Sequence, residues 1–456
     1  MASMRALVLV CLVVAGRLAL AAQTQNPAAP SPNSDEFRVY TDHPRLILTE
    51  QRLRLLKRER ERESQRWRQF DSLVKGAANF PESGFALALY YAVSGDTAVG
   101  KRAVDWALGK ADDLRQIALV YDWCQPLLSP QESTALSAKI RRLLEKHTGD
   151  TISARRDRVF AFIATADDSR HLEEPELAET VEKWWRKGLA PALATGRSTP
   201  PLWDLYPLLE VMHAIRDNLK IDLREDAPDY FMHLPAYLVA ANYPAPYQAP
   251  ESEFRIPVYS GNGQPDLNRA ALARAAGLTM VAYDHNNLEN QFLQGWLIQD
   301  RFLMMNAFGA PYEFLWANPY QPGLSYYQLP LVFHDPNSGV LFVRSAWDEA
   351  ADWFGLFGGE AQLFREGRIT VLNQAGSGSS APKTLHLGQS SVVLGRPPFQ
   401  FSVDNGGTIV LIGLKPSQKY LVETDDEEMS ETSTDRAGSL VLEYPPGRTA
   451  GVRVHE

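Results

Sequence analysis

The spacing of apolar residues changes once along this chain, and that change constrains the fold more than any other feature. From about Pro44 to Ala310 the apolar residues recur every three to four positions, which is the period of an amphipathic helix. After about Pro330, short β-branched and aromatic runs follow one another with Gly, Asn and Pro turns between them. Such runs are typical of a β-sandwich. The sequence therefore predicts a multidomain α+β protein, with a helical half followed by an antiparallel β-sandwich.

The periodic segments give the elements that we expect. In the helical half they are Pro44–Arg68, Gly84–Ser94, Ala98–Lys110, Asp113–Pro126, Pro130–His147, Arg156–Ala166, Glu174–Gly188, Trp203–Asn218, Phe231–Ala241, Asp266–Ala282 and Leu288–Phe308. The short Gly, Pro, Asp and Ser connections between them favour successive antiparallel helices. In the second half the expected strands are Val340–Val343, Arg368–Leu372, Ser391–Leu394, Phe399–Val403, Thr408–Ile412, Tyr420–Glu423, Ser439–Tyr444 and Gly451–Val454.

The N-terminus predicts export. Arg5 precedes an apolar run of about ten residues, and two small residues, Ala19 and Ala21, follow it. We expect a signal peptide at 1–21, a Pro-, Ala- and Ser-rich flexible linker at 22–42, and an exported protein that is periplasmic or extracellular. The helical domain is then 43–330 and the sandwich 331–456. The apolar run is shorter than the ~20 residues of a membrane span, and no later stretch is long enough, so we expect none.

Composition restricts the partners. Asp and Glu number 55 against 46 Lys and Arg, a net charge of −9, which disfavours nucleic acid as a partner. Without residues 1–21, Cys124 is the only cysteine, and no histidine pair has a dense ligand spacing, so we expect no metal or other cofactor. The acidic run Asp425–Glu428 is interpreted as a solvated loop, with calcium binding as the alternative. The oligomeric state stays open.

One helical segment carries the best candidate for catalysis. Tyr206, Glu210 and His213 are spaced i, i+4 and i+7, which places them on one face of a helix. A histidine oriented by Glu210, beside a tyrosine, can serve as acid and base near neutral pH. Trp203 in the same segment offers an aromatic surface to a sugar ring. The alternative is a polar stripe that is hydrogen-bonded within the helical core.

Two further segments supply candidates for substrate binding. His285 and Asn287 lie in a polar loop after an expected helix, where amide and imidazole groups can donate to sugar hydroxyls or to a carboxylate. Asn287 is equally a turn or cap residue. Arg158 closes the basic stretch 153–158 and can pair with a carboxylate in a bidentate manner. The alternative for Arg158 is an ordinary basic helix start.

Several segments together resemble the heparinase II/III-like family. They are His43–Leu53, Leu87–Asp96, Ala118–Trp123 with Leu128–Glu132, and Gly339–Trp347. The resemblance implies an incomplete (α/α) toroid followed by a β-sandwich, and a lyase that cleaves uronate-containing polysaccharides by β-elimination. It also implies that Tyr206 stands roughly where that family places a catalytic tyrosine.

One departure leaves two hypotheses open. Members of the family that cleave carry a His-rich segment after the strand at Arg344–Trp347, whereas residues 353–367 of this chain contain no histidine. The first hypothesis is a polysaccharide lyase with Tyr206 and His213 as acid and base. The second is a catalytically inactive glycan-binding or cell-surface structural protein on the same scaffold. A hydrolase that uses two carboxylates is a third possibility, although no carboxylate pair stands out.

Overall fold

The computed structural model describes residues 34–166, 173–248, 253–260, 263–299, 304–372, 382–426 and 428–456. The predicted signal peptide and the first part of the predicted linker lie outside these ranges. None of the helices in the described part of the chain combines the length and the apolarity that crossing a bilayer requires.

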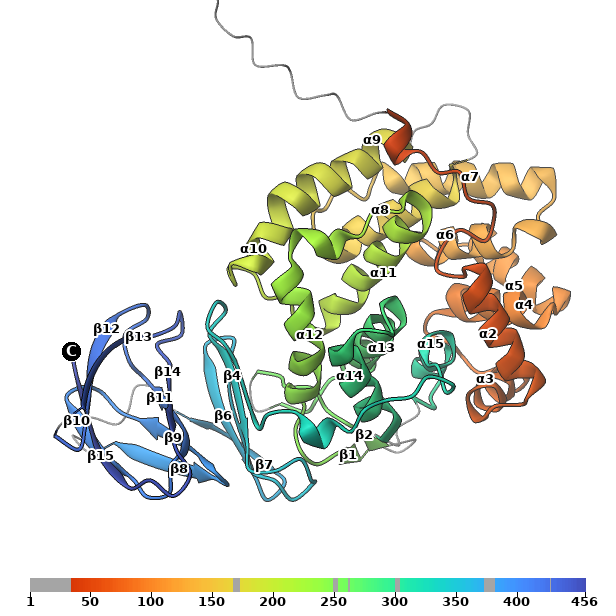
Figure 1. Ribbon diagram of the computed structural model, residues 1–456. Coiled ribbons are helices and arrows are strands. Elements are labelled where there is room, and N and C mark those ends of the chain that lie inside the picture. Colours follow the sequence, from red (N-terminus) through yellow and green to blue (C-terminus); the bar gives the residue numbers. More distant parts are fainter. Residues whose placement is uncertain are drawn as a thin grey trace, which may run out of the picture.

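The first half of the chain is helical, as predicted (Figure 1). Several helices begin at side chains that accept hydrogen bonds from the first free backbone N–H groups, such as Asp113, and Ser129 in a capping box with Glu132. The principal helices are α2 (Glu50–Glu61), α3 (Gln65–Lys75), α4 (Ser83–Ser94), α5 (Thr97–Leu108), α6 (Leu114–Trp123), α7 (Pro130–Leu144), α8 (Ile152–Ala164), α9 (Glu173–Ala178), the π-helix η3 (Glu179–Leu189), α10 (Ala190–Ala194), α11 (Leu202–Leu219), α12 (Pro228–Ala240), α13 (Leu267–Tyr283), α14 (Leu288–Gln299) and α15 (Gly309–Trp316).

Alternate helices form an inner layer. Helices α4, α6, α8, α11, α13 and α15 are neighbours in that order, and α15 also contacts α3 and α4. Every residue of α6 and of α15 is buried, as expected for helices that have neighbours on all sides. Helices α5, α7 and α14 each pack against members of this layer. The order of neighbouring helices supports the predicted incomplete toroid. The toroid itself stays a prediction.

The second half consists of three stacked sheets (Figure 1). The first is the antiparallel meander β3 (Val332–Asp335), β4 (Val340–Arg344), β5 (Trp353–Phe357), β6 (Glu360–Arg365) and β7 (Arg368–Leu372). The second joins β14 (Leu440–Tyr444), β11 (Gly407–Ile412), β9 (Ser390–Leu394) and β8 (Lys383–Leu387). The third joins β10 (Phe399–Val403), β15 (Ala450–His455), β12 (Lys419–Thr424) and β13 (Glu428–Ser433). A short hairpin, β1 (Tyr247–Gln248) with β2 (Glu253–Phe254), lies earlier in the chain.

The middle sheet is buried on both faces. Val392 and Val410 belong to the core shared with the first sheet, whereas Val393 and Leu411 belong to the core shared with the third. Strands buried on both faces need continuous apolar runs, which explains the sequences of β9 and β11. The prediction of a purely antiparallel sandwich is wrong in one respect, because β9 and β11 are parallel. The intervening strand β10 belongs to the third sheet, so the chain re-enters the middle sheet in its original direction.

The first sheet also packs on the helices. Leu341 of β4 faces the middle sheet, while its neighbour Phe342 belongs to the core of the helical half. The Phe342 ring lies 5.9 Å from that of Tyr237 on α12 and 5.6 Å from that of Trp353 on β5. Adjacent residues of a strand point to opposite faces, so one strand serves both cores. The helical half and the sheets are therefore in direct apolar contact.

Candidate functional site

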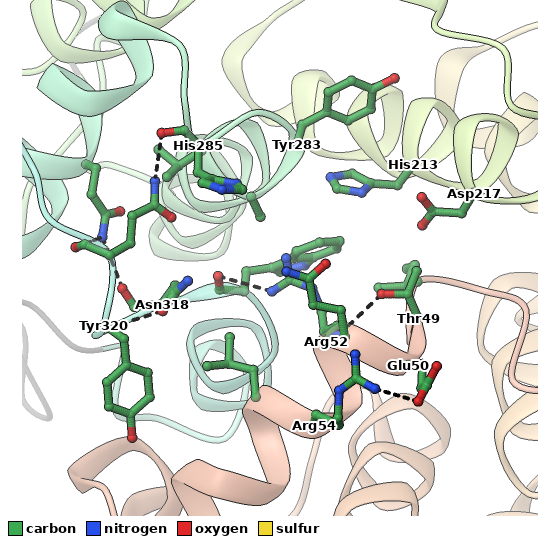
Figure 2. Close-up of a pocket in the computed structure, with 18 of the residues that line it drawn as sticks. Thr49, Glu50, Arg52, Arg54, His213, Asp217, Tyr283, His285, Asn318 and Tyr320 are labelled. Atoms are coloured by element: carbon green, nitrogen blue, oxygen red, sulfur yellow. Dashed lines mark hydrogen bonds and ion pairs between the residues drawn. The ribbon is translucent and has the colours of Figure 1, made fainter.

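A pocket of about 900 Å³ opens at the C-terminal ends of α11, α13 and α15, and the start of α2 crosses it (Figure 2). Its lining comes from segments that are far apart in the sequence. They are Ile47, Thr49, Glu50, Gln51, Arg52, Arg54, Leu55, Arg58, His213, Arg216, Asp217, Val281, Ala282, Tyr283, His285, Gln294, Trp316, Asn318, Tyr320, Gln321 and Pro322.

Arg52 occupies the centre of this pocket in Figure 2. Thr49 caps α2 by accepting a hydrogen bond from the Arg52 backbone N–H, which places Arg52 in the first turn. Its guanidinium lies 4.8 Å from the centre of the Trp316 ring and donates to the Leu315 carbonyl over 3.1 Å. Burial, with a further contribution from Arg216, lowers the pKa of Arg52 to about 10, so the group is still charged at neutral pH. Among the described residues, Arg52 has no carboxylate within ion-pair distance.

The pocket as a whole is cationic, because four arginines line it against two carboxylates. Arg54 pairs with Glu50 over 2.5 Å, and Arg216 lies 3.2 Å from its neighbour Asp217. The other two arginines, Arg52 and Arg58, have no carboxylate partner within the described ranges. An anion that enters the pocket can therefore pair with their guanidinium groups.

Aromatic rings flank these charges. Besides Trp316, the pocket contains Tyr320, which is 41% exposed and whose ring lies 5.9 Å from the guanidinium of Arg58. Tyr283 also lines the pocket, but its hydroxyl donates to the Asp222 carboxylate and not to the pocket. Sugar rings pack on aromatic faces through their C–H groups, and arginine side chains bind their hydroxyls and carboxylates. The lining therefore combines the two kinds of group that an acidic sugar requires.

His213, one of the predicted catalytic residues, lines the pocket, but both of its ring nitrogens are in use. Nε2 lies 3.2 Å from the Thr279 carbonyl, which can only accept, so Nε2 carries the proton. Nδ1 then accepts from Arg216 Nη2 over 3.2 Å. Burial and the charge of Arg216 lower the pKa of His213 well below its ordinary value. The imidazole is therefore neutral, and its lone pair is occupied.

Glu210 does not orient His213, and that prediction is wrong. The Glu210 carboxylate is fully buried and lies 2.6 Å from Arg115 Nη2 and 2.6 Å from Arg156 Nη1. Burial by itself opposes the charged form, but the two arginines outweigh it and lower the pKa of Glu210. Side chains spaced i and i+3 share a helix face, yet the groups packed on that face determine their partners.

Tyr206 lies outside the pocket and is 1% exposed. Its hydroxyl accepts from Trp316 Nε1 over 3.0 Å and from Arg115 Nη2 over 3.4 Å. Burial and the charge of Glu210 raise its pKa well above the ordinary value. The Tyr206 hydroxyl is therefore enclosed and does not face the pocket. Tyr206 instead holds the indole of Trp316, on which Arg52 rests, so it supports the pocket from behind.

The polar loop after α13 contributes one of its two predicted residues to the pocket. His285 lines the pocket, is exposed, and its ring has no hydrogen-bond partner among the described residues. Asn287 lies just before α14, where its side chain accepts from the Asn290 N–H over 3.1 Å, as a cap does. The structure thus places His285 at the site and gives Asn287 the alternative role that its residue type suggested.

The other two predicted substrate-binding residues lie elsewhere. Arg158 pairs with Glu176 over 2.6 Å, and it does not line the pocket. Trp203 stacks with the guanidinium of Arg269 at 4.4 Å and does not line the pocket either. Both predictions assumed a side chain that is free to bind a ligand. In the structure Arg158 is engaged by a carboxylate and Trp203 by a guanidinium group.

Arg52, Asp217 and Trp316 line the pocket but were not among the predicted site residues. The cap residue Thr49 was a usable signal, because it fixes the first turn of a helix and Arg52 within it. The mixed charges that follow are typical of a solvated helix face, which describes Arg54 correctly and Arg52 wrongly. Trp316 and Arg52 are 264 residues apart in the sequence, so no local pattern joins them.

The acidic run at 425–428 forms ion pairs. Asp426 pairs with Arg453, and Arg448 lies 3.5 Å from Asp425 and 3.4 Å from Glu428. Residue 427 lies outside the described ranges. Within those ranges there is no group of three or more His, Cys, Asp or Glu side chains that could hold a metal ion.

Comparisons with known proteins add little to this geometry. The sequence matches no protein-family model and no curated protein. Among solved structures, one named "Glycoside hydrolase" aligns with 82% of this chain and 71% of its own, at 8% sequence identity and a TM-score of 0.31. A likeness at that level carries no argument about activity, so the function is inferred from the pocket itself.

Proposed function

We propose that this chain binds an acidic, uronate-containing polysaccharide in the Arg52 pocket. The observation that carries the proposal is the position of Arg52, which is stacked on Trp316 and lacks a carboxylate partner among the described residues. Its stacking and its hydrogen bond to the end of α15 hold the guanidinium in place before a ligand arrives. A preorganised guanidinium suits a planar carboxylate, because two parallel N–H groups can bind both oxygens.

The rest of the pocket supports the same ligand. Arg58 supplies a second unpaired charge, and the exposed ring of Tyr320 offers a face for a sugar ring. The toroid, membership of the heparinase II/III-like family and export through residues 1–21 are part of this proposal. They rest on the four similar segments, on the order of the inner helices and on the N-terminal pattern. If the signal peptide is removed, sequencing of the exported chain should begin at residue 22.

Titration of the full chain with a panel of uronate polysaccharides, by calorimetry, tests the proposal. We expect one member to bind and Arg52→Ala to weaken its affinity by about 10-fold or more, as loss of a charge-assisted hydrogen bond does. Arg102→Ala is the matched control, because Arg102 is exposed on α5 and lies outside the pocket. Equal binding by Arg52→Ala and the wild type, or no binding to any acidic member, would overturn the proposal.

Cleavage by β-elimination in the same pocket is a second candidate function. Two groups favour it, the imidazole of His285 and the hydroxyl of Tyr320, which both line the pocket and have no hydrogen-bond partner among the described residues. Arg52 would neutralise the uronate carboxylate, which makes the C5 proton more acidic. His285 would remove that proton, and Tyr320 would protonate the departing glycosidic oxygen at C4. The product carries a C4–C5 double bond, which absorbs in the ultraviolet.

A further inference from the structure

A second hollow lies where the helical half meets the sheets. It consists of two adjoining cavities of about 680 and about 250 Å³, between helices α10 and α12 on one side and the turn after β3 on the other. Ala194, His334 and Asn337 are among the residues that line both cavities. We call the two together the junction cleft. None of its lining residues lines the Arg52 pocket, so the two sites are separate.

Two glycines, which have no side chain, allow the backbone segments around the junction cleft to pack closely. Gly196 has a φ of 63°, and a Cβ added to it would lie 2.1 Å from the backbone carbon of Asn337. Gly339 has a φ of 75°, and a Cβ there would lie 2.6 Å from the Cβ of Ala437. The turn between β3 and β4 is thus in close contact with the helical half and with the loop after β13. Such close packing gives a cleft that is formed before any ligand binds.

A histidine and an aspartate meet in the wall of the cleft. His334 Nε2 lies 2.9 Å from Asp435 Oδ2, and the other carboxylate oxygen accepts from the N–H groups of Ala437 at 2.8 Å and Ser439 at 2.7 Å. A carboxylate bound in this way accepts only, so Nε2 of His334 carries the proton. The Nδ1 atom of His334 has no hydrogen-bond partner among the described residues.

Three hydroxyl groups in the cleft are likewise without partners among the described residues. Tyr230 and Tyr237 line the smaller cavity, and burial raises the pKa of each, so both hydroxyls keep their protons. Ser439 lines the larger cavity, is 1% exposed, and its Oγ has no hydrogen-bond partner. Of the three, only the Ser439 oxygen is fully buried, whereas Tyr230 and Tyr237 are half-buried in the wall of the smaller cavity. The two tyrosine hydroxyls are therefore available to a polar ligand.

The cleft differs from the Arg52 pocket in charge. Three carboxylates line it against a single arginine, Arg436. A uronate would meet repulsion there, because like charges raise the free energy of the bound state. Aromatic surface is present as well, since Phe333 lines the smaller cavity and its ring lies 5.8 Å from that of Tyr237. The three carboxylates are those of Asp229, Asp335 and Asp435.

We propose that the junction cleft is a second carbohydrate site, which binds an uncharged sugar unit. A neutral sugar supplies hydroxyls that both donate and accept, which suits the hydroxyls of Tyr230 and Tyr237 and the unpartnered ring nitrogen of His334. It also has the C–H faces that pack on aromatic rings. This site needs no charge on its ligand and does not depend on what the Arg52 pocket binds.

Calorimetric titration of the full chain with neutral tetrasaccharides tests the proposal. The probes are a β-1,4-glucan, an α-1,4-glucan, a β-1,4-mannan and a chitin oligosaccharide. We expect one to bind and Tyr237→Phe to weaken its affinity by about fivefold, the loss of one hydrogen bond, with a larger loss when Tyr230→Phe is added. These variants keep the aromatic ring, so the packing of the cleft is preserved. Tyr40→Phe is the matched control, because Tyr40 is exposed and lies outside both sites.

The results separate this proposal from the one for the Arg52 pocket. Arg52→Ala should leave the neutral ligand bound with unchanged affinity. The junction cleft is not a carbohydrate site if none of the neutral probes binds, or if the double variant Tyr230→Phe, Tyr237→Phe binds as tightly as the wild type. Loss of neutral binding in Arg52→Ala would place that ligand in the Arg52 pocket and would equally contradict the proposal.

Discussion

Arg115 Nη2 lies 2.6 Å from Glu210 Oε1 in the buried interior of the helical half. Arg156 binds the second oxygen of the same carboxylate, so Glu210 is the anion shared by two buried cations. The three residues come from α6, α8 and α11, three successive members of the inner layer. One carboxylate therefore links three helices, and this link gives Glu210 a structural role where the sequence had predicted a catalytic one.

Removing that charge should destabilise the fold. Glu210→Gln keeps the shape of the side chain but leaves Arg115 with only the more distant Glu82, at 3.4 Å, and Arg156 with only Asp157. Breaking a buried ion pair in this way costs up to about 3–5 kcal/mol. We expect a corresponding drop in the free energy of unfolding measured with urea. Glu61→Gln is the control, because Glu61 is exposed at the end of α2, and its effect should stay within about 0.5 kcal/mol. A stable Glu210→Gln protein that fails to bind or cleave polysaccharide would return Glu210 to the functional site.

The neutral state of His213 makes stability depend on pH. Burial and Arg216 lower its pKa in the folded protein, so between that value and its ordinary value of 6.5 the unfolded chain binds more protons. Stability then rises with pH across this window and is lost as the pH falls below about 6.5, by up to about 1.4 kcal/mol per pH unit.

The measurement compares urea unfolding of the wild type and of His213→Gln between neutral pH and pH 5. The glutamine variant lacks the titrating group, so its stability should fall less steeply with acidification. Asp217, whose pKa burial raises, titrates in both proteins and cancels from the difference. If the free energy of unfolding falls equally with pH in the two proteins, His213 binds a proton as readily in the folded state as in the unfolded state, which would contradict the prediction.

The contact between Gly196 and Asn337 can be tested with a pair of glycine variants. Gly95 and Gly196 both have a positive φ, so alanine strains the backbone at each by ~1–2 kcal/mol. At Gly95 an added Cβ meets no atom within 4 Å, whereas at Gly196 it would meet the Asn337 backbone. Gly196→Ala should therefore cost a further ~1–3 kcal/mol of unfolding free energy. Equal costs at the two positions would show that the helical half and the first sheet separate easily at this point.

If elimination takes place in the Arg52 pocket, changing its acid or base should lower the rate at which ultraviolet absorbance rises. If the wild type raises the absorbance of a uronate polysaccharide, His285→Ala and Tyr320→Phe should each lower the rate by at least ~100-fold, as expected for loss of a general base or acid. Tyr327→Phe is the matched control, since Tyr327 is exposed and outside the pocket. New reducing ends without absorbance would instead indicate hydrolysis. A rate that survives both changes would remove these residues from the reaction.

Local sequence determined the elements. The three-to-four residue period of the first half and the short β-branched runs of the second predicted many of the helices and strands, because each needs its own spacing to bury one face. The single helix expected at Pro44–Arg68 is instead two, α2 and α3, and strands such as β6 and β13 lie outside the expected runs. Caps such as Ser129 with Glu132 fixed where helices begin, since they satisfy backbone groups within one turn. Spacing also predicted that Tyr206 and Glu210 share a helix face, and both side chains accept from the same guanidinium nitrogen of Arg115.

Only the tertiary structure decided what those faces meet. It turned Glu210 towards two arginines of neighbouring helices, enclosed Tyr206 behind Trp316, and left His213 at the wall of the pocket. The guanidinium of Arg52 is positioned at the site by the ring of Trp316, which comes from the other end of the helical sequence. The physical reason is that burial and partner charges govern what a polar side chain can do, and both depend on residues that are remote in the sequence.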